Sequence, residues 1–356
     1  MHPCASMIII LYWLTKIVAG VARYTYLYLR GQTPPTVNYT QGATIGFIHS
    51  SGKGLTLAQS RQSLEWGFQA IQSKTGLATP EQRAQWAKYY KHEKGTATDG
   101  GGVGGSGYWI PFQDQTHKVT DPSKDSNQEA TDLAKRRIDF VNQSRVGEGC
   151  DLVVFFIHGG GFVQGHPLQS LDLFKRIMRK THQHHDLKVG FFSVQYSGDS
   201  AGGNLCYSLA LKIRDEWSPA FLPGAICSSS PYFPWTDKIQ STLFDVADPD
   251  QVDYFVDAYT QQRPEVLASP YYTPFNADTL AGLPNSLIFW GSVEVLACWI
   301  QKFVDQARKD GVKVETMTKQ DRSHCWFMLD PISTVEDREE AIDAISTFLA
   351  QQTRRS

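Results

Sequence analysis

The sequence has no excess of charge of one sign and no cysteine pairs at metal-binding spacing. It carries 34 Lys and Arg against 36 Asp and Glu, for a net charge of −2. A protein that binds nucleic acid through its charge normally shows a basic excess, so no nucleic-acid partner is predicted. None of the six cysteines forms a C-x-x-C pair, which argues against a zinc site or a disulfide framework. We expect no metal and no cofactor.

A long uninterrupted hydrophobic run is also missing. The most apolar stretch, residues 7–29, is broken by Lys16 and Arg23, which lie seven residues apart and so share one face of a helix. A spanning helix needs roughly 20 mostly apolar residues. The pattern favours an interfacial or marginal membrane anchor, and an amphipathic helix packed on the protein body is the alternative. It predicts a membrane-associated location, for example at the endoplasmic reticulum, with a cytoplasmic location as the alternative.

Composition and periodicity predict three regions. Residues 1–30 form the apolar anchor or helix, residues 31–107 a helical lid, and residues 108–356 the core. Apolar residues recur at helical spacing over 55–94, and a glycine-rich connection follows at 100–107. That connection lacks the Gly-Lys-Ser/Thr ending of a phosphate loop, so it predicts no nucleotide site.

The motif Gly-Asp-Ser-Ala-Gly-Gly at 198–203 lies between an apolar run at 189–196 and a helix-forming run at 204–212. Strand, sharp turn and helix in this order hold a serine in a strained backbone conformation, exposed for attack on a carbonyl carbon. Ser200 is the candidate nucleophile, and the backbone N–H of Ala201 is a candidate oxyanion donor. An inert serine in a glycine-rich turn is the alternative if the motif stands alone.

A second glycine motif supports the catalytic interpretation. The apolar run at 151–157 predicts a buried parallel strand, and it ends in His-Gly-Gly-Gly at 158–161. Acyl transfer builds negative charge on the carbonyl oxygen, and backbone N–H groups aimed at that oxygen are among the largest catalytic contributions. Glycines let the backbone approach the substrate closely. The donors expected here are Gly160 and Gly161.

These two motifs together resemble the hormone-sensitive-lipase-like family of α/β-hydrolases. Residues 283–296 resemble the family's late strand and acid loop, and residues 321–326 resemble its histidine loop. The resemblance implies a mostly parallel central sheet with flanking helices and an N-terminal helical lid. Members with an apolar N-terminal anchor and Glu in the acid loop, many of them fungal, are most similar.

The resemblance assigns Ser200 as nucleophile, His324 as general base and Glu294 as the carboxylate that orients His324. Residues also support His324 independently, because it follows a strand-like run at 312–317 and lies in a polar turn before a helical C-terminus. The order Ser, acid, His along the chain is that of this fold. Relatives often carry Asp where this chain has Glu294.

The sequence departs from the family between the two glycine motifs. A helix and a separate strand that should lead into Ser200, on the order of 30 residues for one crossover unit, are missing. The run 189–196 must then either serve as the strand before the serine or keep its own place in the sheet. In the second case Ser200 is expected to shift by a strand spacing of about 4.8 Å from the oxyanion donors.

The sequence therefore predicts a serine carboxylic-ester hydrolase that acts on a small or lipophilic ester through an acyl-enzyme, by analogy in secondary metabolism. The alternative is a catalytically impaired or non-catalytic relative that binds a hydrophobic ligand. A peptidase or amidase on the same scaffold also stays open, because nothing in the sequence separates amide from ester substrates. No oligomeric state is predicted.

Overall fold

A computed structural model describes Thr15 and residues 18–51, 107–110, 149–163, 165, 170–194, 198–234, 242, 244–328 and 332–353. The predicted lid helices at 55–94 and most of the glycine-rich connection lie outside the described residues. The chain divides into two compact units. The first contains the described parts of Met1–Arg61, Gly159–Gln164 and Ser197–Ala341, and the second those of Gln62–His158, Gly165–Tyr196 and Ile342–Ser356.

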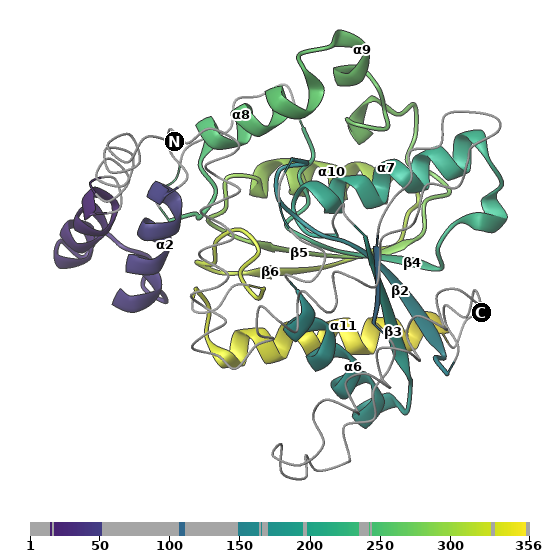
Figure 1. Cartoon of the computed structure of the whole chain (residues 1–356), viewed down its shortest axis with the longest axis horizontal. Helices are drawn as coiled ribbons and strands as arrows, with labels where there is room; N and C mark the ends of the chain where they lie inside the picture. The colour runs from purple at the N-terminus through teal and green to yellow at the C-terminus, as the bar shows by residue number, and fades with distance from the viewer. Residues whose placement is uncertain are drawn as a thin grey trace, which may run out of the picture. The chain divides into compact units, whose positions relative to one another are not determined.

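The second unit contains a sheet of order β1–β3–β2 and the helix α6 (Figure 1). Its elements are β1 (Gly107–Ile110), β2 (Leu152–Ile157), α6 (Leu171–His185) and β3 (Val189–Val194). β2 and β3 are parallel and in register from Leu152↔Val189 to Ile157↔Val194, whereas β1 is antiparallel to β3. The β2–α6–β3 unit is the crossover that the apolar runs predict.

The described part of the run 189–196, β3 (Val189–Val194), therefore keeps its own place beside the strand that leads into the glycine motif. Within the described residues, β3 pairs with β1 and β2 and makes no ladder with the strand that contacts the serine turn. The alternative in which this run leads directly into Ser200 as a strand of the same ladder is wrong. Among the described residues, no separate strand precedes the serine.

β2 is only partly buried, which corrects the prediction of a fully buried strand. Phe174 of α6 stacks on Phe191 of β3 with ring centroids 4.4 Å apart, and it meets Phe156 of β2 edge-on at 4.7 Å. These contacts cover one face of the sheet. On the other face, Val153 and Phe155 are 39% and 49% exposed. Successive crossovers cover opposite faces when the strand order reverses, so this is the face a further crossover helix would cover.

The first unit is built around a parallel sheet of order β4–β5–β6. In chain order, its elements are α2 (Tyr39–Ser51), α7 (Ala201–Glu216), η1 (Pro219–Phe221), β4 (Ala225–Ser229), α8 (Pro249–Thr260), α9 (Pro264–Leu267), η2 (Pro274–Asn276), β5 (Asn285–Gly291), α10 (Ala297–Lys309), β6 (Val314–Lys319) and the start of α11 (Val335–Thr353). β5 is the central strand, and nearly all its residues are buried. This burial is consistent with the apolar run at 287–290 in its middle.

The core of the first unit lies between this sheet and the helices α7 and α10, which lie on the same side of it in Figure 1. Phe233 stacks on Phe303 of α10 at 3.8 Å, and Tyr207 of α7 meets both rings edge-on. Ile288 of β5 is completely buried in the same cluster. Aromatic pairs of this kind add about 0.5–1.5 kcal/mol each beyond their buried area. Helix α7, which begins directly after Ser200, is thus held in place by its packing in this core.

An N-terminal pair of helices also belongs to the first unit. Residues 18–29 are helical, and α2 begins with a capping box in which the Gln41 N–H donates to Asn38 Oδ1 at 2.9 Å and the Asn38 N–H donates to Gln41 Oε1 at 3.0 Å. Tyr24 is buried against Gly42, where a Cβ would lie 1.6 Å from the tyrosine ring. This part of the apolar stretch packs on α2, as the packed-helix alternative expects.

Other apolar side chains of the same helix face outward. Val18 is 65% exposed, Tyr26 59% and Leu29 79%. Among the described residues, no helix is both long and apolar enough to cross a membrane. Membrane association of this segment therefore stays a prediction.

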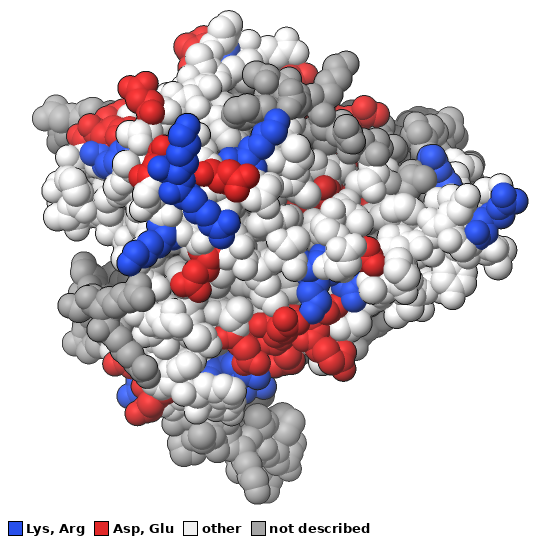
Figure 2. Space-filling model, turned by 180° about the vertical axis from the view of Figure 1, so that it is seen from behind, with Lys and Arg blue, Asp and Glu red and all other residues white. Residues whose placement is uncertain are grey.

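Charged side chains of both signs lie interspersed on the face shown in Figure 2. One exposed pair is Lys212–Glu216, at 2.6 Å one turn apart on α7. Pairs of this kind contribute about 0–1 kcal/mol each because water screens them. The surface pairs therefore add little to the stability of the fold.

Candidate active site

Ser200 lies at the sharp turn before α7, as the motif predicts. Its backbone has φ 53° and ψ −120°, a strained conformation for a residue with a side chain. The Ser200 N–H donates to Ser229 O of β4 at 2.9 Å, and its carbonyl accepts from Tyr232 N–H at 2.8 Å. The Ser200 side chain makes no capping hydrogen bond to α7. Its hydroxyl is therefore free for chemistry, next to the positive end of the helix dipole.

A single parallel bridge, Asp199↔Ser229, connects this turn to β4. The position just after the turn is also tightly packed. A Cβ at Gly203 would lie 2.5 Å from Ser228 Oγ and 2.7 Å from Pro231 Cβ. The second glycine of the Gly-Gly pair is thus required by the approach of α7 to the loop after β4.

The glycine loop after β2 meets the serine turn at Asp199. The Gly159 N–H donates to Asp199 Oδ1 at 2.7 Å, and a Cβ at Gly159 would lie 2.1 Å from Asp199 Oδ2. Gly160 and Gly161 have φ values of 133° and 59°, which residues with side chains rarely adopt. The contact through Asp199 joins the turn to the glycine loop, and the expected shift of Ser200 relative to Gly160 and Gly161 stays a prediction.

Glu294 and His324 come together from the loops after β5 and β6. Glu294 Oε2 lies 3.8 Å from His324 Nδ1, which is too long for a hydrogen bond. Glu294 Oε2 instead accepts from Ser230 Oγ at 2.7 Å, and its Oε1 is buried without a hydrogen bond. In enzymes without bound substrate, hydrogen bonds between catalytic groups are often long and shorten in the complex.

The histidine loop also adjoins the serine turn. Cys325, the residue after His324, places its Sγ 3.9 Å from Asp199 Oδ2. The Cys325 N–H donates to Ser230 Oγ at 2.9 Å, so one serine hydroxyl contacts both the acid and the histidine loop. The structure thus brings together the turn of Ser200, the glycine loop and the loops of both other predicted triad residues.

Burial shifts the pKa values of His324 and Glu294 in opposite directions. It lowers the pKa of His324 from 6.5 to about 4, so the imidazole is neutral at pH 7 and able to accept a proton. It raises the pKa of Glu294 well above its usual range, and the nearby charge of Asp245 raises it further. The Ser230 hydroxyl and the Gly291 N–H act in the other direction, because they favour the carboxylate.

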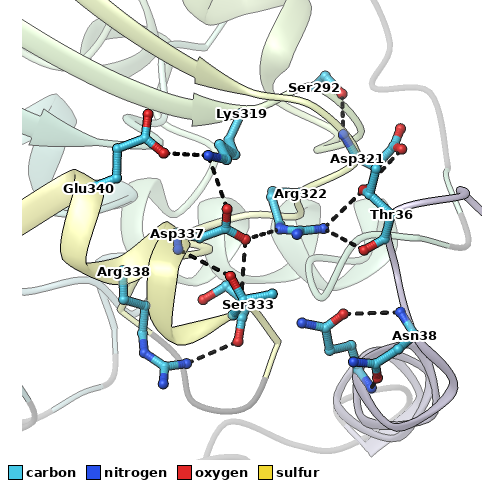
Figure 3. Close-up of polar contacts among 12 residues, drawn as sticks. Thr36, Asn38, Ser292, Lys319, Asp321, Arg322, Ser333, Asp337, Arg338 and Glu340 are labelled. Atoms are coloured by element: carbon cyan, nitrogen blue, oxygen red, sulfur yellow. Dashed lines mark hydrogen bonds and ion pairs between the residues drawn. The ribbon is translucent and has the colours of Figure 1, made fainter.

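A buried ion-pair network anchors the histidine loop, residues 321–326 (Figure 3). The Arg322 Nε donates to Asp337 Oδ2 of α11 at 2.7 Å, and both side chains are less than a tenth exposed. The Arg322 Nη1 donates to the carbonyl and hydroxyl of Thr36, at 3.2 and 3.1 Å. Lys319 of β6 adds a second contact to Asp337 at 3.0 Å. The segment before α2 is thereby tied to the residue two positions before His324.

Sequence reasoning predicted Ser200, His324 and Glu294 as nucleophile, base and acid, and it missed Asp199, Ser230 and Arg322 as contacts between their loops. Asp199 and Ser230 stand beside or between recognised motifs, yet their side-chain partners come from segments up to 126 residues away. Arg322 lies inside the histidine motif itself. A charged residue next to a predicted catalytic histidine is the signal that could have drawn attention to it.

Asp199 is expected to make stability fall as the pH rises. Burial raises its pKa from 3.8 to about 7, so between these values the folded protein holds a proton that the unfolded chain has lost. Its contribution is largest below pH 3.8 and lost towards pH 7. A shift of about 3 units corresponds to about 4 kcal/mol. Urea unfolding at pH 4 and pH 7 should show the difference in unfolding free energy between wild type and Asp199→Asn changing by this order, and parallel pH dependences would refute it.

Comparison with known proteins supports the fold. Residues 171–328 match the family described as "alpha/beta hydrolase fold". A curated protein named "Esterase" from Acinetobacter venetianus is 26% identical, over 46% of this chain and 63% of that protein, so the chain spans less than two thirds of that relative's length. The crystal structure of an esterase from the bacterial hormone-sensitive lipase family covers 89% of this chain and 99% of its own, at 19% identity and a TM-score of 0.57.

A carboxyl esterase from the mycorrhizal fungus Tuber melanosporum covers 56% of this chain and 77% of its own, at 19% identity and a TM-score of 0.47. The conclusion about the fold depends on the family match and on the structure that covers most of the chain. With its parallel strands, flanking helices and serine turn at the start of α7, this chain has the α/β-hydrolase fold.

Proposed function

We propose that this protein is a serine hydrolase of carboxylic esters. The observation that carries the proposal is the strained turn at Ser200, which meets the glycine loop through Gly159–Asp199 and the histidine loop through Asp199–Cys325. A serine inert in a structural turn would not need a positive φ, a free hydroxyl and contact with both loops. The curated relative named esterase favours an ester over an amide substrate.

In the proposed reaction, Ser200 Oγ attacks the carbonyl carbon of the ester while His324 Nε2 takes the hydroxyl proton. The carbonyl oxygen becomes an oxyanion that accepts from the N–H groups of Gly160, Gly161 and Ala201. The intermediate collapses, the C–O bond to the alcohol breaks, and His324 gives its proton to the leaving alcohol. Water then hydrolyses the acyl-enzyme by the same steps.

Glu294 holds the imidazole and stabilises the imidazolium that forms in each step. This requires the 3.8 Å separation between Glu294 Oε2 and His324 Nδ1 to shorten to a hydrogen bond of about 2.8 Å. The gap is also the observation that favours the second candidate, a catalytically impaired relative. The two candidates differ in whether the triad closes when substrate binds.

Aromatic side chains beside the glycine loop favour a lipophilic substrate. Phe162 follows the last of the three glycines and stacks on Tyr259 of α8 at 4.5 Å. Tyr232 and Tyr272 lie 5.8 and 5.7 Å from the same ring. A Cβ at Gly161 would meet Phe255 at 2.4 Å, so α8 closes tightly over the loop. An apolar acyl or alcohol group is what such surroundings would bind.

The test is turnover of p-nitrophenyl acetate and butyrate by the purified full chain beside Ser200→Ala, with labelling of both by a fluorophosphonate probe. We expect turnover and labelling in the wild type and loss of both in the variant, with a fall in kcat of about 10⁴-fold or more. The matched control is Ser218→Ala, which removes a hydroxyl that caps η1 and is not part of the predicted triad. No turnover and no labelling by a folded wild type would favour the impaired relative.

A membrane-associated location is proposed as well, on the exposed Val18, Tyr26 and Leu29 of the N-terminal helix. Flotation of the full chain with liposomes of phosphatidylcholine tests it, and a protein that stays at the bottom of the gradient would contradict it. A role in secondary metabolism stays a prediction.

A further inference from the structure

The loop between β4 and α8 contains a carboxylate that no motif pointed to. Asp245 is completely buried, and each of its two oxygens accepts a hydrogen bond from a different loop of the site. Oδ1 accepts from the His324 N–H at 2.7 Å, and Oδ2 accepts from the Val295 N–H at 2.7 Å. Val295 is the residue directly after Glu294. One side chain thus contacts the backbone of the base and the backbone beside the acid.

Charge-assisted hydrogen bonds of this length are roughly twice as strong as neutral ones. Burying a carboxylate is costly, and a fold keeps one where its acceptor groups are needed. Here the N–H groups belong to two loops that follow different strands, β5 and β6. The Glu294 and His324 side chains can work together only if the two loops that carry them are held at a fixed distance. The hydrogen bonds from both loops to Asp245 provide such a connection.

We propose that Asp245 is a positioning residue that fixes the acid loop and the histidine loop relative to each other, so that Glu294 can orient His324. The inference deepens the proposed function and depends on it. Asp245 touches neither the substrate nor the reacting atoms. Its effect passes through the backbone of the two loops, and a displacement of about 1 Å at the reacting groups can lower the rate about 10²-fold.

Separately from these two carboxylate contacts, the same loop is joined to the N-terminal region. The carbonyl of Asp245 lies 2.9 Å from His49 Nδ1 of α2, and His49 Nε2 lies 3.2 Å from Asp248 Oδ2. Asp248 is the N-cap of α8, and its Oδ1 accepts from the Gln251 N–H at 3.4 Å. Asp248 is therefore a second buried aspartate on the same loop, and its carboxylate contacts His49 and the first turn of α8.

The comparison of Asp245→Asn with Asp248→Asn isolates this role. Each variant replaces a buried carboxylate by an amide of the same shape. In both, one acceptor oxygen becomes an NH₂ group, and the loss of its hydrogen bond lowers the stability of the fold. In Asp245→Asn, the amide NH₂ faces one of the two backbone N–H donors, and one loop loses its acceptor. In Asp248→Asn, the two loops keep both hydrogen bonds to Asp245.

We expect Asp245→Asn to lower kcat for p-nitrophenyl butyrate 10- to 100-fold, with KM changed less than threefold. Hydrogen exchange measured on peptides that contain Val295 and His324 should be at least tenfold faster at these amides. Asp248→Asn should lower the melting temperature while leaving kcat and both amides close to wild type. Equal effects of the two variants on kcat and exchange, or no effect of Asp245→Asn on either, would overturn the proposal.

The exchange measurement separates this proposal from the proposed function. If the wild type shows no turnover that depends on Ser200, the esterase proposal fails. Exchange that is faster at Val295 and His324 in Asp245→Asn but not in Asp248→Asn would still show that Asp245 holds the two loops. Unchanged exchange in Asp245→Asn would reject the positioning role of Asp245 as well.

Discussion

Glu294→Gln is expected to lower kcat about 10³-fold or more while leaving the protein as stable as the wild type or more so. The amide cannot stabilise the imidazolium that forms on His324, and the corresponding change in a serine protease triad costs about 10⁴-fold. Stability should not suffer, because burial raises the pKa of Glu294 and the carboxylate is costly in that position. Steady-state kinetics and thermal unfolding of the same preparation give both values.

Glu265→Gln provides the matched control for this change. Glu265 lies on α9 with 69% of its side chain exposed, and its Arg263 partner is 4.0 Å away. The same chemical replacement there should leave kcat within twofold of the wild type. A Glu294→Gln variant that keeps more than a tenth of wild-type kcat would exclude Glu294 as the orienting acid and would direct attention to another carboxylate.

Gly291→Ala is expected to destabilise the protein by about 3 kcal/mol or more. Gly291 ends β5, and an added Cβ would lie 1.8 Å from the carbonyl oxygen of Arg322 and 2.4 Å from its carbonyl carbon. These are backbone atoms, and they cannot shift cheaply because the Arg322 side chain is held by Asp337 and Thr36. The histidine loop would be pushed away from the acid loop, so kcat should fall as well.

Gly224→Ala is the control for Gly291→Ala. Gly224 precedes β4, has no atoms within 4 Å of an added Cβ and has no positive φ. Alanine at such a position changes stability by less than about 1 kcal/mol and can increase it. Urea unfolding of both variants measures the difference, and two alanine variants of equal stability would show that the acid and histidine loops have room to separate.

The motifs predicted local structure better than the assembly of the site. The turn at Ser200 with the helix after it, a glycine loop after β2 and a histidine after β6 were readable because each depends on residues close in sequence. The absence of a strand before Ser200 was also readable from the spacing. The hydrogen bond from the Gly159 N–H to Asp199, which joins the serine turn to the glycine loop, was not readable from the spacing.

What could not be predicted depends on residues far apart in the chain. Asp245 belongs to a loop with no recognisable motif, and its partners are 50 and 79 residues away. The exposure of Phe155 on β2 likewise depends on which helices cover the sheet, which the apolar run itself does not encode. The triad residues are local signals, whereas the groups that hold them together are tertiary ones.

The single bridge between Asp199 and Ser229 has a consequence for how the serine turn responds to substitutions elsewhere. Among the described residues, the turn contacts β4, the glycine loop and the histidine loop. Since these three segments are far apart in the sequence, a substitution in any one of them is transmitted to the position of the candidate nucleophile.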